Sequence, residues 1–210
     1  MNDTKIYPHP LEYAKENGEL EAYWGSAKVN RECAAAIDKA ITASNYELYH
    51  YDLSEALNAV TKEFGLDRVA WVVADVIQAS EHDGRYSRAN KEWAQDASVP
   101  REKIRDFTLR SHPVVLDGFA DKVRQVRLHE LAQTVGAYEK SHHMAERNRL
   151  TSFDGDKGCF IANRGVTERR LTERCAEITE KQSVRAQLRA AKKAEKTASA
   201  PEKKRHEAER

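Results

Sequence analysis

The feature that most constrains the fold is an apolar run in the first half of the chain. Residues 69–77 read Val-Ala-Trp-Val-Val-Ala-Asp-Val-Ile, so the run is apolar on nearly every side of a helix. Its valines also suit a strand, but the run is longer than most strands, and Gly65 and Leu66 leave a short connection from a preceding helix. We therefore predict a buried central helix, with a strand as the alternative.

Helical spacing of apolar residues recurs before this run. In residues 20–41 they fall three, four and seven positions apart, which predicts a long amphipathic helix. A second stripe over residues 53–64 stops at Gly65, a residue type that commonly ends helices. We expect three large side chains on these apolar faces to share one core: Trp24, Trp71 and Phe119.

The next segment predicts two short helices and then a long one. A short helix carries Trp93, and Ser98-Val99-Pro100 starts another. Ser111-His112-Pro113 is a further helix start, with Ser111 as the cap. Apolar residues repeat with helical spacing over 115–126, and three more could extend the same helix: Leu128, Leu131 and Val135.

The last third of the chain contains fewer apolar residues at helical spacing than the first two thirds. Residues 150–163 place Asp154-Gly155-Asp156-Lys157-Gly158 between two short apolar segments, which predicts a β-hairpin. A helix that starts at Thr167 contains few large apolar residues. Beyond Lys196 the composition buries too little apolar surface to offset the chain entropy, which indicates a disordered tail.

The predicted fold class is therefore all-α: a mainly helical single domain with a small β-hairpin and a basic, partly disordered C-terminal helix and tail. We place the helical domain at residues 6–135, the hairpin and helical extension at 136–180, and the basic tail at 181–210. Charge is divided in a similar way, since residues 1–121 hold 14 Lys and Arg against 21 Asp and Glu, whereas residues 181–210 hold 10 against 4. The two ends either offer surfaces to different partners or are a folded body with a solvated tail.

Cysteine usage and hydropathy indicate the compartment. Cys33, Cys159 and Cys175 are odd in number and widely spaced, so neither a disulfide framework nor a zinc ribbon is expected. The apolar residues never form a run of about 18, and the first residues lack a basic segment followed by an apolar one. We therefore expect a cytoplasmic protein without a membrane partner.

Three ordered motifs carry a resemblance to a known family. The first runs Ile6-Tyr7-Pro8-His9-Pro10-Leu11-Glu12-Tyr13-Ala14 and continues through Asn17-Gly18-Glu19-Leu20. The second is Asp83-Gly84-Arg85-Tyr86-Ser87-Arg88 with Lys91-Glu92-Trp93-Ala94, and the third is Ser111-His112-Pro113. Together they resemble the domain-of-unknown-function 3849 family over about Ile6 to Val126. The resemblance implies an accessory gene of conjugative and other mobile elements in gut Firmicutes, and it supplies no catalytic residues.

The second motif contains the most unusual polar stretch of the predicted domain. Arginine presents a fork of donors that suits phosphate or carboxylate, so Arg85, Tyr86 and Arg88 are candidates for an anion or partner contact. The alternative is a structural loop, in which both arginines bind backbone carbonyls or neighbouring acids and Tyr86 packs inward.

A second candidate site lies at the basic end. Arg185, Arg189, Lys192, Lys193 and Lys196 recur at helical spacing and would form one basic stripe, which can follow the phosphates of a nucleic acid. Aromatic residues are absent from residues 181–210, so this binding would be salt-sensitive and independent of base sequence. A solubilising tail is the alternative interpretation.

Sequence patterns of catalytic and metal sites are weak. His142 and His143 stand near Glu139 and Glu146, but His-Glu-x-x-His is missing and a surface helix is the simpler interpretation. Residues 154–165 begin like a calcium loop and then lack the required Gly and Glu. Neither a nucleophile elbow nor a glycine-rich phosphate loop occurs. We predict no catalytic residues, no metal and no cofactor.

Two functions follow from these observations. The first is a non-enzymatic accessory protein of a mobile genetic element that binds a protein or nucleoprotein partner, for example to inhibit a host defence system. The alternative is a nucleic-acid-binding adaptor in conjugative transfer that uses the basic C-terminal helix. An enzyme whose site has no sequence signature is a third class. Truncation after Glu180 should abolish binding by the adaptor and spare binding by the accessory protein.

Overall fold

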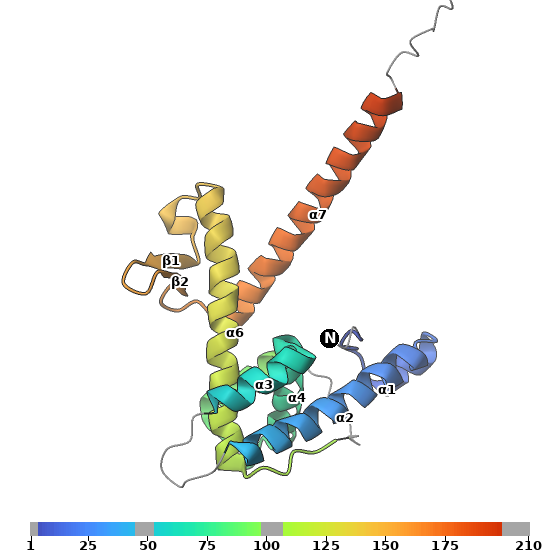
Figure 1. The fold of residues 1–210 in the computed structure, drawn as a ribbon, viewed down its shortest axis with the longest axis vertical. Helices are drawn as coiled ribbons and strands as arrows, with labels where there is room; N and C mark the ends of the chain where they lie inside the picture. The colour runs from blue at the N-terminus through green and yellow to red at the C-terminus, as the bar shows by residue number, and fades with distance from the viewer. Residues whose placement is uncertain (1–3, 45–52, 98–106, 199–210) are drawn as a thin grey trace, which may run out of the picture. The chain divides into compact units, whose positions relative to one another are not determined.

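The computed structural model describes residues 4–44, 53–97 and 107–198, and the side chains in its last helix as far as Val184, with Ala186 and Gln187. This part of the chain contains seven α-helices and one two-stranded antiparallel hairpin (Figure 1). The all-α class with a small β-hairpin is thereby confirmed. The chain divides into two compact units, Met1–Glu130 and Leu131–Arg210. The predicted tail beyond residue 198 lies outside the described residues.

The described residues of the first unit form helices and connecting segments. The helices are α1 (Leu11–Glu16), α2 (Leu20–Ala43), α3 (Ser54–Phe64), α4 (Leu66–Ala79), α5 (Arg88–Asp96) and the first part of α6 (Pro113–Ser141). The apolar run is helical throughout, so the helix prediction for residues 69–77 is confirmed and the strand alternative is wrong. The helix start predicted at Ser98-Val99-Pro100 lies outside the described residues.

A single glycine joins α3 to α4. Gly65 has a φ of 80°, in the left-handed region that glycine adopts without a side-chain clash. Its N–H donates to the carbonyl of Thr61 at 2.9 Å, and its carbonyl accepts from the N–H of Val69 at 3.2 Å. The same residue therefore ends one helix and starts the next, which confirms the predicted helix end at Gly65.

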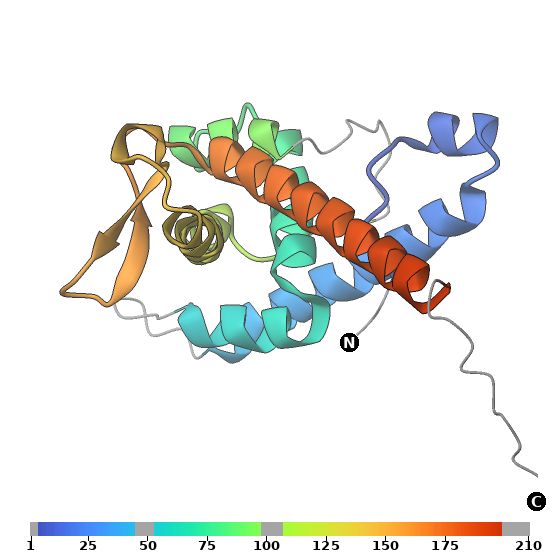
Figure 2. The ribbon, with the colours of Figure 1, turned by 90° about the horizontal axis from the view of Figure 1, so that it is seen from above.

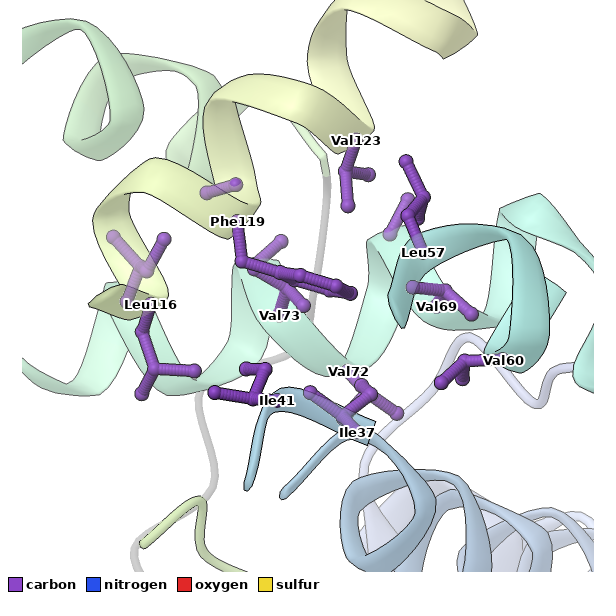
Figure 3. Packing of buried hydrophobic residues seen from close by; sticks show 14 of the residues in the cluster. Ile37, Ile41, Leu57, Val60, Val69, Val72, Val73, Leu116, Phe119 and Val123 are labelled. Carbon is purple, nitrogen blue, oxygen red and sulfur yellow. The ribbon is translucent and has the colours of Figure 1, made fainter. Parts of the chain in front are cut away.

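Helix α4 lies at the centre of the hydrophobic core. Four of its larger apolar side chains are almost completely enclosed: Val69, Val72, Val73 and Ile77. Side chains from α2, α3, α5 and α6, together with Leu53 and Tyr86, complete the cluster. Figure 3 shows Phe119 of α6 pointing in among these residues, with Ile37 of α2 beside Val72. Because burial of apolar surface is the main favourable term in folding, this cluster stabilises the first unit.

The prediction that three large aromatic side chains share this core is wrong for one of them. Phe119 is fully buried, and Trp71 is partly buried against the cluster. Trp24, in contrast, is 47% exposed. The buried residues of α2 begin at Ser26, so the first turn of this long helix extends past the core and leaves Trp24 on the surface.

The second unit combines the end of α6 with a hairpin and a long helix. Its further elements are a 3₁₀ turn (Glu146–Asn148), β1 (Thr151–Asp154), β2 (Cys159–Ala162) and α7 (Glu168–Ala198). The strands pair antiparallel (Figure 2). Thr151 lies opposite Ala162, and Asp154 lies opposite Cys159. The hairpin predicted over residues 150–163 and the helix predicted after Thr167 are therefore both confirmed.

Polar side chains of α6 hold the hairpin within this unit. The buried carboxylate of Glu139 accepts from the N–H of Leu150 at 2.9 Å and from the hydroxyl of Thr151 at 2.8 Å. The amide of Gln133 donates to the carbonyl of Phe160 at 2.7 Å and accepts from its N–H at 3.1 Å. These bonds satisfy backbone groups that would otherwise be costly to bury.

A glycine in α6 makes room for the hairpin, and its substitution should loosen the second unit. A Cβ atom at Gly136 would lie 2.2 Å from Cγ and 2.7 Å from Cβ of Phe160. We expect Gly136→Ala to reduce the free energy of unfolding by about 1–3 kcal/mol, as overpacking does. Urea denaturation measures the loss, and faster amide hydrogen exchange over residues 151–162 would locate it in the hairpin.

Gly155→Ala is the matched control for that substitution. Gly155 lies in the loop between the two strands, and a Cβ atom there would meet nothing within 4 Å. We expect a change within about 0.5 kcal/mol, as for ordinary surface positions. Equal stability of the Gly136 and Gly155 variants would contradict the packing described for Phe160.

Candidate functional site

The third motif anchors the start of α6 to α2. The backbone N–H and the hydroxyl of Ser111 donate to Asp38 Oδ1 at 3.0 and 2.6 Å, and the N–H of Arg110 donates to Asp38 Oδ2 at 2.8 Å. Ser111 is therefore not the helix cap that the sequence predicts. The first turn of α6 uses His112 instead, whose Nδ1 accepts from the N–H of Val114 at 3.3 Å. The carboxylate of Asp38 directs the hydroxyl of Ser111 away from the helix.

The second motif is tied to α6 by a polar network. Asp117 Oδ1 accepts from the N–H of Ser87 at 2.9 Å and from the side-chain amide of Asn90 at 2.8 Å. The oxygen of that amide accepts from Arg124 at 2.9 Å. Ser87 also caps α5, because its hydroxyl accepts from the N–H of Asn90 at 3.2 Å. The polar groups of this motif thus hold α5 in place.

The three candidate contact residues of the second motif have partners inside the unit. Arg85 donates to both oxygens of Asp83, at 2.9 Å from Nε and 2.7 Å from Nη2, and these bonds lower the pKa of Asp83 to about 2. Arg88 donates to Glu92 at 2.7 Å. Tyr86 is 5% exposed and belongs to the hydrophobic core. These are the contacts of a structural loop, and a partner contact through Arg85, Tyr86 and Arg88 stays a prediction.

The first motif begins in an extended segment that is fixed on α2 and α4. We call residues 4–10 the N-terminal strap. Arg68 is 4% exposed, and its guanidinium donates to Asn30 Oδ1 at 2.5 Å, to the carbonyl of Ser26 at 3.3 Å and to the carbonyl of Thr4. The N–H of Tyr7 donates to the hydroxyl of Ser26 at 3.0 Å. The strap therefore has a defined position in the first unit.

Burial makes Arg68 an unusual anchor. Its hydrogen-bond acceptors among the described residues are neutral oxygens, and burial lowers the pKa of its guanidinium. A buried charge is costly unless hydrogen bonds replace its water, so these bonds are required for the charge to stay there. The position of the strap is thus coupled to the burial of Arg68.

Five aromatic rings form a continuous row over the strap, α1 and the first turn of α2, which are blue in Figure 1. The ring of Tyr13 lies 4.2 Å from that of His9, and His9 lies 5.7 Å from Tyr7. Tyr7 contacts Tyr23 edge-on at 5.9 Å, and Tyr23 contacts Trp24 edge-on at 5.0 Å. These distances are typical of favourable aromatic pairs. We call these five residues the aromatic row.

The two ends of the aromatic row face the solvent. Tyr13 is 41% exposed and Trp24 is 47% exposed, and Leu20, one turn before Trp24, is exposed as well. At the middle of the row the hydroxyl of Tyr7 donates to Glu19 at 2.5 Å. Desolvation and this hydrogen bond raise the pKa of Tyr7 to about 12, so its phenol keeps its proton at neutral pH.

None of the five row residues is a site residue predicted from the sequence, and Trp24 is predicted in the core. The available signal is local composition, because all five ring-bearing residues fall between positions 7 and 24 and three of them lie in the first motif. Helical periodicity alone assigns them to an apolar face. It does not distinguish a face that meets the core from one that meets the solvent.

The basic stripe lies on α7. The backbone of this helix runs without a break from Glu168 to Ala198, so all five stripe positions lie on one helix. At about 100° per residue, they fall within an arc of about 100°. The described side chains stop short of these positions, which are Arg185, Arg189, Lys192, Lys193 and Lys196. Nucleic-acid binding through them stays a prediction.

The remaining reactive groups do not form a grouped site in the described part of the chain. No group of three His, Cys, Asp or Glu side chains suited to a metal occurs among these residues. Helix α6 ends at Ser141, and His143 has a φ of 49°, so the helical spacing considered for Glu139 and His143 does not hold. Burial raises the pKa of the Cys33 thiol to about 12, which keeps it protonated and weakly nucleophilic.

Comparison with known proteins gives one match. The model of a family described as "Protein of unknown function (DUF3849)" matches residues 6–128. The chain belongs to this family. Neither a curated protein nor a solved structure matches the chain. The aromatic row and all three motifs lie inside the residues that the DUF3849 model matches, whereas the hairpin and α7 lie outside them.

The residues matched by the DUF3849 model include one of the two candidate surfaces and not the other. The aromatic row is part of the DUF3849 region, and the basic stripe belongs to the sequence that follows it. In the second and third motifs, the described polar contacts go to groups in the same unit. The first motif differs because it presents rings to the solvent. Helices long and apolar enough to cross a bilayer are absent from the described residues.

Proposed function

We propose that the protein is a non-enzymatic accessory factor of a mobile genetic element that binds a protein partner through the aromatic row. The observation that carries this proposal is the exposure of Tyr13 and Trp24 at the ends of a row whose strap is held by internal hydrogen bonds. The position of the row inside the DUF3849 match supports it. The mobile-element context rests on the resemblance of the three motifs.

Physical chemistry favours a protein partner for such a surface. Neighbouring exposed apolar groups are uncommon on monomeric proteins and often mark interaction sites. Tyrosine and tryptophan are enriched in binding hot spots, because each offers a large contact area. The hydrogen bonds of Arg68 and Ser26 fix the strap before binding, which lowers the entropy lost on association.

The proposed mobile-element context narrows the kind of partner. We place the accessory factor in the cytoplasm of its host cell, where it can meet host proteins. Inhibition of a host defence system is one form of the proposed function, and the partner is then a defence protein or its nucleoprotein complex. In that case the aromatic row covers a functional surface of the defence protein.

The test of this function is capture of the partner from the native host, with the 210-residue chain carrying a C-terminal tag and the lysate treated with nuclease. We expect Trp24→Leu to reduce the captured partner by about tenfold or more, because interface hot spots contribute about 2 kcal/mol or more. The matched control is Phe153→Leu, which alters a 55% exposed aromatic residue outside the row.

Two outcomes would contradict the proposed function. Equal capture by the wild type and the Trp24 variant would show that the row is not the binding surface. Equal losses with the Trp24 and Phe153 variants would show that exposed aromatic residues act without regard to position. Circular dichroism of each variant checks that the helical fold is retained.

One observation favours the alternative function, a nucleic-acid-binding adaptor in conjugative transfer. Helix α7 continues through all five stripe positions, and at about 100° per residue these positions share one side of the helix. In this case truncation after Glu180 abolishes capture, nuclease treatment has the same effect, and Trp24→Leu changes nothing. The aromatic-row proposal requires the opposite result in all three comparisons.

A further inference from the structure

We infer that the aromatic row binds an arginine-rich segment of the protein partner, with guanidinium groups over the rings of Tyr13 and Trp24. This inference rests on the proposed function and specifies the chemistry of the partner at the same surface. The observation that carries it is the placement of glutamates beside the rings.

Three exposed glutamates accompany the row. Glu19 accepts the hydrogen bond from the Tyr7 hydroxyl, in the middle of the row. Glu16 follows Tyr13 by three residues in α1, and Glu21 precedes Trp24 by three residues in α2. Residues three apart are neighbours on a helix surface, so each exposed end of the row has a carboxylate beside it.

Arginine matches this combination of groups. The face of an aromatic ring carries negative charge density, which attracts a cation placed over it, and Trp and Tyr are the best rings for this contact. A guanidinium can also stack flat on a ring while its N–H groups donate to a carboxylate. The second unit contains the related contact with lysine, since Nζ of Lys140 lies 5.4 Å from the centre of the Phe153 ring.

The charge of the surroundings argues against a nucleic acid as the occupant. Exposed aromatic rings can stack on bases, but such sites also carry basic groups that follow the phosphates. Residues 4–28 carry four exposed glutamates, Glu12, Glu16, Glu19 and Glu21, against three exposed lysines, Lys5, Lys15 and Lys28, so the surroundings of the row are acidic by one charge. Residues 1–121 as a whole hold 21 acidic against 14 basic residues. Electrostatic complementarity therefore favours a basic peptide.

The test is a titration of the 210-residue chain with a fluorescein-labelled peptide of alternating arginine and glycine, followed by fluorescence anisotropy and by the indole N–H signal of Trp24. The matched probe has citrulline in place of arginine, which keeps the shape and removes the charge. We expect the arginine peptide to shift the Trp24 signal and the citrulline peptide to leave it unchanged. The third probe is single-stranded oligothymidine of equal length.

Variants of the chain separate the contribution of the aromatic ring from that of the carboxylates. Trp24→Leu should weaken the arginine peptide about two- to fivefold, the size of one exposed cation–π contact. Glu16→Gln combined with Glu21→Gln should weaken it by a similar factor, and this loss should vanish at high salt because exposed charges are screened. Phe153→Leu should leave the affinity unchanged.

Three results would overturn the inference, and the first and the third of them leave the proposed function intact. Equal binding of the arginine and citrulline peptides would remove the role of charge, and tighter binding of oligothymidine at Trp24 would make the surface a nucleic-acid site. Failure of the arginine peptide to bind, with partner capture still sensitive to Trp24→Leu, would mean that the partner presents another chemistry. The proposed function itself fails if capture is insensitive to Trp24→Leu, or if Trp24→Leu and Phe153→Leu lower capture equally.

Discussion

Replacing Phe119 by alanine should lower the free energy of unfolding by about 3–5 kcal/mol, the largest effect of any single substitution considered for this protein. Phe119 is fully buried and points from α6 into the cluster around α4 (Figure 3). The loss combines the transfer of the ring out of the core with a cavity that α4 and α6 cannot close completely. Urea denaturation followed by circular dichroism measures it.

The control for this prediction is Trp24→Ala, which removes a larger ring from the surface. We expect a loss of no more than about 1 kcal/mol, because most of the cost is the edge-on contact with Tyr23. Trp71→Ala should lie between the two, since Trp71 is partly buried against the core. A larger loss at Trp24 than at Phe119 would mean that the core has been assigned to the wrong helix faces.

The second large effect is expected at Arg68. Arg68→Met keeps the unbranched stem and removes the guanidinium, which leaves Asn30 Oδ1 and the carbonyl of Thr4 without this donor. Hydrogen bonds to a charged group contribute about 1.5–3 kcal/mol, and we expect a loss of that size. The strap should also loosen, which faster hydrogen exchange at the N–H of Tyr7 would report.

Arg88→Met is the matched control for Arg68. The side chain of Arg88 is 92% exposed and pairs only with Glu92, four residues along its own helix, among the contacts described here. Exposed ion pairs of this kind contribute about 0.3–0.5 kcal/mol. Equal losses of unfolding free energy in the Arg68 and Arg88 variants would show that the hydrogen bonds of Arg68 to the strap stabilise the first unit no more than an exposed ion pair does.

The sequence predicts the helical elements well, because each rests on a local pattern. The apolar run of α4 is too long for a typical strand, and Gly65 marks the boundary of α3 and α4 with the positive φ that its residue type favours. The hairpin follows from Asp and Gly in a short connection between two apolar segments. Such signals need no knowledge of distant contacts.

The aromatic row could not be predicted in the same way, because it depends on where the core ends along α2. Steps of three, four and seven residues link Trp24 to Ile37 and Ile41 in one apparent stripe, although at 100° per residue Trp24 lies about 140° around the helix from Ile37. Only the tertiary packing shows that α3 and α4 cover the later turns of α2. The hydrogen bonds of Arg68 could not be predicted either, because their acceptors lie far from Arg68 in the sequence.

The attachment of the strap by Arg68 has a consequence for genetic experiments. If the gene were mutagenised at random and screened for loss of the proposed partner binding, the recovered changes would fall into two classes. Changes at Tyr13 or Trp24 would act directly and leave the protein abundant in the cell. Changes at Ser26, Asn30 or Arg68 would release the strap from a distance, and these alleles would be temperature-sensitive, because the same hydrogen bonds support the fold.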